Sequence, residues 1–203
     1  MAGIRASRER DTPLEDNVPG DQHPIRLHED YAKVGFVFSH RDIRYRAEIP
    51  DHAAIATVGN EKITPLAEVA FDQIVEYDRT CFPAPRPTFL KGWLSQPDAL
   101  ALGCQRQGKL SGYAVVRRCR EGCKIGPLFA DDAQAAQTLY GHLAEFASGG
   151  PLFLDVPENN PAAIELVRRH RMVEVFGCAR MYLGAPPELA HHRIFGVTTF
   201  ELG

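Results

Sequence analysis

Two carboxylates, Glu76 and Asp78, stand near the end of a segment with helical spacing, shortly before Cys81. A carboxylate there can bind an amine or accept its proton, which is the work of a general base. A solvated helix end is the alternative interpretation of both residues. Cys81 could be a nucleophile only beside a base, and no histidine is placed near it in the sequence, so a small buried hydrophobe is the alternative there.

A second stretch that could do chemistry is Ile125-Gly126-Pro127-Leu128, which lies inside an apolar run. Proline has no backbone N–H, so within a strand it marks a sheet edge or a place where two strands separate. Separated strands leave free backbone N–H groups that can donate to an oxygen of a bound ligand. A simple strand end explains the same residues. Asp131 and Asp132 follow, and either can cap a helix that starts there.

The elements that hold these residues follow from hydrophobic spacing and turn residues. Helices are predicted at 65–82, 87–96, 131–148 and from Asn160 to about Arg171. Strands are predicted at 31–49 (as two short strands), 99–106, 109–118, 122–129, 151–157, 172–177 and 179–184. Thr64 is expected to cap the first helix with Pro65 at its first position, and Gln107–Gly108 to form a tight hairpin turn. This order predicts an α+β (mixed α/β) fold with helices packed on a twisted sheet.

Composition narrows the class of protein. The 203 residues carry a net charge of -3 with a sequence pI of about 6.2, which does not favour binding to nucleic acid or to an acidic membrane surface. No apolar run is long enough to span a bilayer, and the charged N-terminus is not that of a signal peptide. Five irregularly spaced cysteines indicate a reducing, cytoplasmic setting. Cys119 and Cys123 lack a second ligand pair, so no metal is expected.

Several short sequence motifs together resemble those of the GNAT superfamily of N-acetyltransferases. Asn160-Pro161-Ala162-Ala163-Ile164-Glu165-Leu166 is similar to the start of that fold's fourth helix, although Val167 replaces the usual Tyr and Arg171-Met172 replace Gly-Phe. Tyr31-Ala32-Lys33-Val34-Gly35-Phe36 resembles the end of the same helix–strand unit. Residues 63–203 therefore look like the C-terminal domain of tandem YitH-type acetyltransferases, a GNAT-like twisted and mostly antiparallel sheet flanked by helices, with a C-terminal strand extension.

The resemblance implies a domain plan. Residues 1–24 are expected to be disordered or loosely packed, 25–49 to be the remnant of a preceding GNAT domain, and 50–62 to be a linker. Either the chain is a truncated tandem protein or the remnant packs on a single complete domain. The β-rich segments 34–49 and 195–202 could pair with each other, which we favour, or with another copy in a homodimer.

The resemblance also implies site residues. Acetyl-CoA would be held by Ile125, Gly126, Pro127, Leu128, Asp132, Ala133 and Asn160, although the start of the 131–148 helix lacks the glycines and the cation usual in this fold. The substrate groove would contain Cys81, Phe82, Arg86 and Trp93. Glu76, Asp78 and Tyr140 would be the catalytic candidates, with buried or solvated side chains as the alternative. The implied function is acetyl transfer from acetyl-CoA to a small-molecule amine; the alternative is a catalytically silent GNAT-fold module that binds a small ligand or a partner domain.

Overall fold

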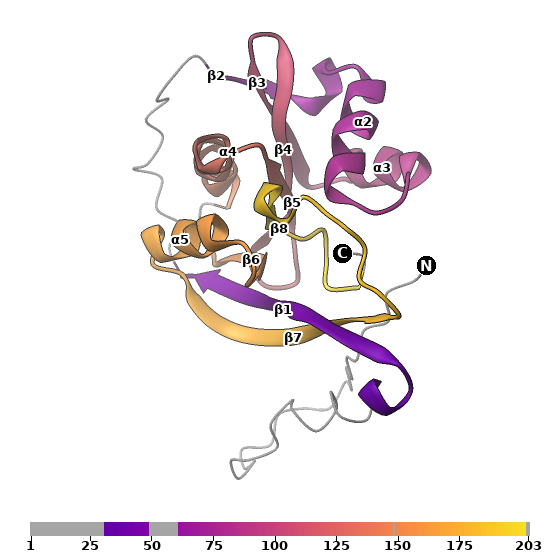
Figure 1. Ribbon diagram of the computed structural model, residues 1–203. Helices are drawn as coiled ribbons and strands as arrows, with labels where there is room; N and C mark the ends of the chain where they lie inside the picture. The colour runs from indigo at the N-terminus through magenta and orange to yellow at the C-terminus, as the bar shows by residue number, and fades with distance from the viewer. Residues whose placement is uncertain (1–30, 49–60, 148, 202–203) are drawn as a thin grey trace.

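The computed structural model describes residues 31–48, 61–147 and 149–201 (Figure 1). The helices are α2 (Phe71–Cys81), α3 (Pro87–Leu94), α4 (Ala133–Phe146) and α5 (Pro161–Arg169), with the 3-10 turns η1 (Leu66–Glu68) and η2 (His191–Arg193). The strands are β1 (Phe36–Ala47), β2 (Glu61–Pro65), β3 (Ala99–Arg106), β4 (Lys109–Arg118), β5 (Cys123–Ala130), β6 (Leu152–Pro157), β7 (Val173–Leu183) and β8 (Ile194–Gly196).

The strands of the described residues belong to one sheet with the order β2-β3-β4-β5-β6-β1-β7, and β8 pairs with β5 beside this path. Among these strands, only β5 and β6 are parallel neighbours, while every other neighbouring pair is antiparallel. The α+β fold class with a mostly antiparallel sheet is therefore confirmed. The strands predicted at 99–106, 109–118 and 122–129 correspond to β3, β4 and β5, which are consecutive antiparallel neighbours and form a meander.

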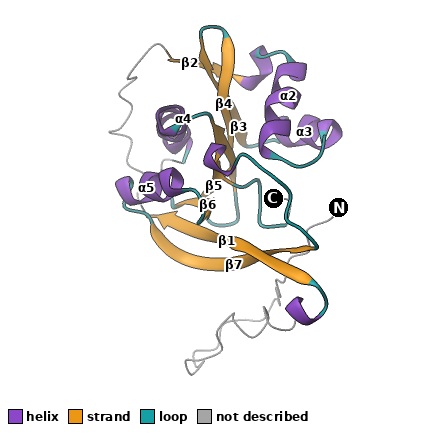
Figure 2. Ribbon diagram, viewed as in Figure 1, coloured by secondary structure: helices purple, strands orange, loops and turns teal. Residues whose placement is uncertain are grey.

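The helices cover the sheet from two sides, with α4 and α5 on one face and α2 and α3 on the other (Figures 1 and 2). The core under α4 is fully buried and includes Leu139 and Leu143 from the helix, with Val116, Ile125 and Leu154 from the sheet. The central strands are long buried apolar runs because both of their faces are covered. No helix within the described residues is both long enough and apolar enough to cross a bilayer.

Three local predictions are confirmed. Gln107 and Gly108 both have positive φ angles, 53° and 76°, as a tight hairpin turn requires. The Asp132 side chain accepts a hydrogen bond from the Ala135 N–H, which makes Asp132 the cap of α4. The Asn160 side chain likewise accepts from the first N–H groups of α5. At the other end of α5, Arg171 has φ 52°, a conformation that glycine adopts more easily.

Other predicted boundaries are wrong. The first helix starts at Phe71 rather than Pro65, because Thr64 and Pro65 pair with β3 as the end of β2. Each of the two regions expected to contain two strands, 31–49 and 172–184, forms one long strand, β1 and β7. These two strands pair along nearly their whole length, with bulges absorbing the irregularities in the pattern.

The N-terminal part of the described chain is integrated into the sheet. β1, from the segment 34–49, lies between β6 and β7. The pairing of this segment with the segment 195–202, which we favoured, is therefore wrong. The latter segment pairs with β5 instead. Residues 1–24 and most of the expected linker lie outside the described residues, while Glu61 and Lys62 belong to β2. Whether 25–49 derives from a preceding domain stays a prediction.

Candidate active site

The parallel strands β5 and β6 separate where the sequence predicted it. Their pairing runs only from Cys123 to Ile125 on β5 and stops before Gly126. Beyond this point β6 continues to Pro157 without a β5 partner. The separation starts at Gly126-Pro127, which fits the loss of a backbone donor at proline.

The gap between β5 and β6 is filled by the chain itself. The C-terminal segment (Ile194–Phe200) enters it, with Gly196 opposite Leu128 in the β8–β5 pairing. On the other side, the Val197 N–H donates to the Asp155 carbonyl of β6 over 2.9 Å. This segment is buried throughout. The backbone groups expected to face a thioester at Leu128 are therefore in strand pairing with β8.

Two glycines allow this close approach. A Cβ on Gly126 would lie 2.4 Å from the Thr198 carbonyl oxygen, and one on Gly196 would lie 2.5 Å from Leu154 Cδ1. The Gly126 carbonyl in turn accepts a hydrogen bond from Trp93 Nε1 over 3.0 Å. Trp93, expected in the substrate groove, thus holds the strand at the point of separation.

Asn160 fastens the C-terminal segment to α5. Its amide oxygen caps the helix, and its Nδ2 donates to the carbonyl oxygens of Ile194 and His192 over 2.9 and 3.3 Å. At the far end, the Phe200 ring lies 4.6 Å from the Arg44 guanidinium and 5.5 Å from the Phe176 ring. Asn160, expected to bind the cofactor, therefore positions the segment that fills the gap.

The start of α4 is acidic and already paired. Asp132 Oδ2 receives Arg106 over 2.9 Å, and Asp131 Oδ1 receives the Tyr77 hydroxyl over 2.8 Å and Arg193 over 3.0 Å. Burial opposes ionisation of Asp132, but its hydrogen bonds from Arg106 and from the Ala135 N–H lower its pKa overall. Asp132 is thus anionic, and both carboxylates already contact arginines of this chain, so this helix start is not prepared for a pyrophosphate. Ala133, the first residue of α4, is exposed.

The three catalytic candidates lie in different places. Asp78 is buried in an ion pair with Arg86, with two N–O distances of 2.8 and 2.9 Å, and accepts the Tyr113 hydroxyl over 2.5 Å. Glu76 is exposed on the outer side of α2. Tyr140 is on the buried face of α4, fully buried, with its hydroxyl 3.7 Å from Met172 Sδ. The structure does not bring these three side chains together.

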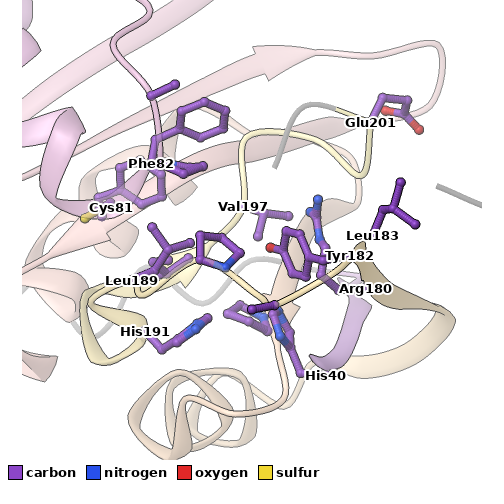
Figure 3. Close-up of a pocket in the computed structure, with 17 residues that line it drawn as sticks. His40, Cys81, Phe82, Arg180, Tyr182, Leu183, Leu189, His191, Val197 and Glu201 are labelled. Atoms are coloured by element: carbon purple, nitrogen blue, oxygen red, sulfur yellow. The ribbon is translucent and has the colours of Figure 1, made fainter. Parts of the chain in front are cut away.

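A cavity of about 530 Å³ opens beside the C-terminal segment, between the end of α2 and the far half of β7 (Figure 3). It is lined by His40, Cys81, Phe82, Pro83, Ala84, Phe129, Pro157, Arg180, Tyr182, Leu183, Ala185, Pro187, Leu189, His191, Ile194, Val197 and Glu201. Cys81 and Phe82 were expected to line a substrate groove, and they lie here. Arg86 is not among the lining residues, because it pairs with Asp78 behind the Phe82 ring.

Two histidines that the sequence analysis did not select meet at the floor of this cavity. The rings of His40 and His191 are edge to face, with 5.3 Å between their centroids (Figure 3). His40 Nε2 lies 3.4 Å from the buried Asp42 carboxylate, and its Nδ1 lies 2.9 Å from the Ser39 hydroxyl. Burial, and secondarily the charge of His40, lowers the pKa of His191. His191 is therefore neutral at physiological pH and has a nitrogen that can accept a proton.

The Cys81 thiol is a poor nucleophile in this setting. Burial is the main cause that raises its pKa to about 11, although a hydrogen bond with Thr80 acts in the opposite direction. Because the thiolate is the reactive form, a thiol with this pKa is almost fully protonated and unreactive near neutral pH. Cys81 is therefore not suited to act as a nucleophile.

Comparisons with known proteins agree with this fold. Residues 74–196 match the family described as acetyltransferase (GNAT) domain. A holothin acyltransferase from Pseudoalteromonas sp. (strain SANK 73390) is 26% identical over 176 residues, which are 86% of this chain and 58% of that protein. Among solved structures, a candidate acetyltransferase from Pyrococcus horikoshii superposes with a TM-score of 0.69 at 24% identity, covering 88% of this chain and 57% of that one.

A conserved protein of unknown function from Staphylococcus epidermidis has a TM-score of 0.60 at 13% identity, over 81% of this chain and 68% of that one. At these identities, the structural matches concern the fold alone. The chain spans a little over half the length of the holothin acyltransferase and of the Pyrococcus horikoshii protein.

Proposed function

Because the chain belongs to the family of acetyltransferase (GNAT) domains, we propose that it acts in N-acetyl transfer from acetyl-CoA to a small-molecule amine. The observation that carries this proposal is the cavity beside α2, which has apolar walls and a neutral histidine on its floor. Its volume is within the range of pockets that take small molecules. The similarity to a holothin acyltransferase supports acyl transfer as the reaction class.

In this proposal the amine binds in the cavity and attacks the thioester directly. The attacking nitrogen must lose a proton, and the thiolate that leaves must gain one. His191 is the side chain of the described lining best suited to accept the first proton. The cytoplasmic setting and a homodimer stay predictions, as do the absence of a metal and of nucleic-acid or membrane partners.

One observation favours a second candidate function. The C-terminal segment fills the gap in which the donor was expected, and the start of α4 presents two paired carboxylates. A domain with these features could bind a small ligand or a partner domain without turnover. In that case the donor would not bind to this chain alone.

Two measurements on the full chain separate these functions. Calorimetric titration with acetyl-CoA should show saturable binding, and a thiol-detecting assay with a panel of amines should show release of CoA that depends on the amine. Binding of an amine with no release of thiol by any member of the panel would refute the transferase proposal and leave the binding module.

A matched pair of variants locates the acceptor. Ala185→Trp places a large side chain in the exposed part of the cavity lining and should lower amine-dependent thiol release at least tenfold. Ala67→Trp makes the same change at an exposed position in η1, away from the cavity, and should leave the rate unchanged. Equal rates in the two variants would show that the acceptor binds elsewhere.

A further inference from the structure

Arg180, a cation in the cavity lining, already has a partner within the protein. Arg180 directs both Nε and a terminal nitrogen to Asp42 Oδ2, over 3.2 and 3.0 Å, so its positive charge faces a fully buried carboxylate. Glu201 lies on the opposite side of the cavity from His191 (Figure 3), and its charge raises the pKa of Arg44 together with the stronger effect of Asp155. Glu201 is the one carboxylate among the described lining residues, and it does not stand beside the histidines.

This balance bears on the charge of the ligand. An alkyl ammonium ion that leaves water needs a carboxylate as its partner, and a buried charge without one is strongly unfavourable. The Asp42 carboxylate is behind His40 and Arg180 rather than in the lining. A cationic amine would thus lose hydration at the floor of the cavity and gain no counter-charge there.

The polar group that is available at the floor is His191. Its Nδ1 is buried and has no hydrogen-bond partner among the described residues. A buried polar atom without a partner is costly, and a ligand that supplies one gains in affinity. Figure 3 shows the His191 ring directed into the pocket toward His40, and His191 belongs to the cavity lining, so a molecule bound there contacts this ring.

The walls favour a flat, apolar molecule. The rings of Phe82, Phe129 and Tyr182 line the cavity, and Pro83, Pro157 and Pro187 add further rigid apolar surface. Aromatic rings bind to such surfaces through their faces and edges, with little loss of rotational freedom.

We infer that the cavity selects an uncharged aromatic amine, a weak base whose N–H donates a hydrogen bond to His191. The inference rests on the proposed function, because it identifies the acceptor of that reaction. An aromatic amine carries no charge at neutral pH and needs no counter-ion, and its nitrogen can be placed next to His191 at the floor. After attack on the thioester, the proton of the new ammonium centre passes to His191, while the thiolate leaves with the electron pair of the broken C–S bond.

The test compares two amines of nearly the same shape by calorimetry at pH 7.5, where binding is measured without turnover. The probes are 8-aminoquinoline, which is uncharged, and 8-(aminomethyl)quinoline, which is a cation. We expect the uncharged amine to bind at least tenfold more tightly. Equal affinity, tighter binding of the cation, or no binding of either probe would overturn the inference. Thiol release with some other class of amine would then still leave the proposed function standing.

A pair of neighbouring histidines gives the control. His191→Ala removes the acceptor and should weaken binding of 8-aminoquinoline by roughly three- to tenfold, the value of one hydrogen bond. His192→Ala changes the exposed neighbour, which is not in the lining, and should leave the affinity unchanged. Equal affinities in the two variants would overturn the role of His191. An unchanged unfolding temperature of His191→Ala shows that the loss is local.

Discussion

The buried group of Asp78, Arg86 and Tyr113 can be tested for stability, because the same carboxylate was a candidate base in the sequence. In Asp78→Asn the side chain keeps its shape but loses its charge. The Arg86 guanidinium, whose side chain is 9% exposed, would then be buried without a counter-ion. The Tyr113 hydroxyl, fully buried, would lose an ionised acceptor.

Removing one partner of such a pair costs about 3 kcal/mol or more in the free energy of unfolding. For a domain of this size, 1 kcal/mol corresponds to roughly 2–4 °C, so the unfolding midpoint should fall by about 6–12 °C. Thermal unfolding followed by circular dichroism measures this change directly.

The control is Glu76→Gln on the same helix. That carboxylate is exposed, so its removal should change the free energy of unfolding by less than about 0.5 kcal/mol. A double variant, Asp78→Asn with Arg86→Met, removes both charges and should lose less stability than the sum of the single changes. An unaltered midpoint in Asp78→Asn, accompanied by loss of activity, would refute the structural role and restore Asp78 as a base.

Two further predictions concern the gap and the thiols. Gly126→Ala should lower the free energy of unfolding by about 1–3 kcal/mol, because its Cβ would lie 2.4 Å from the Thr198 carbonyl oxygen. Gly92→Ala, in an open position of α3, should raise the free energy of unfolding by about 0.5–1 kcal/mol, and urea unfolding measures both changes. Similar values for the two variants would mean that the C-terminal segment is not held against β5. Burial raises the pKa of Cys81 and of Cys104 to about 11 in the folded protein. The contribution of these thiols to stability is therefore complete below the unfolded pKa of about 8.5 and is lost as the pH rises toward 11. Thermal unfolding midpoints measured from pH 7 to pH 11 should fall over this range, and a constant midpoint would contradict the prediction.

Much of the fold could be predicted from local pattern. Gln107–Gly108, Asp132 and Asn160 act within a few residues of themselves, so their turn and cap roles could be predicted from the sequence. The start of the first helix could not be predicted in this way. Thr64-Pro65 has the form of a helix start, but pairing with β3 overrides that preference.

The candidate site depended on contacts between distant segments. Cys81 and Phe82 were expected in the substrate groove because of the resemblance to the GNAT fold, and both line the cavity. His40 lies in an alternating strand and His191 in a proline-rich connection, and nothing in either neighbourhood links the two. A polar residue that alternates onto the buried face of a strand, as His40 does, is the one local signal that could have directed attention to it.

The position of β1 and β8 within the sheet has a consequence for the order of folding during synthesis. Arg44 of β1 pairs with Asp155, 111 residues later in the chain, so β1 must wait for β6 and β7 to be made. Leu128 of β5 likewise lacks its β8 partner until Gly196 has left the ribosome. Pairings between such distant segments form slowly, and until they form the nascent protein presents apolar strands to its surroundings. Protection of the nascent protein by chaperones would therefore matter most during the synthesis of the last third of the 203 residues.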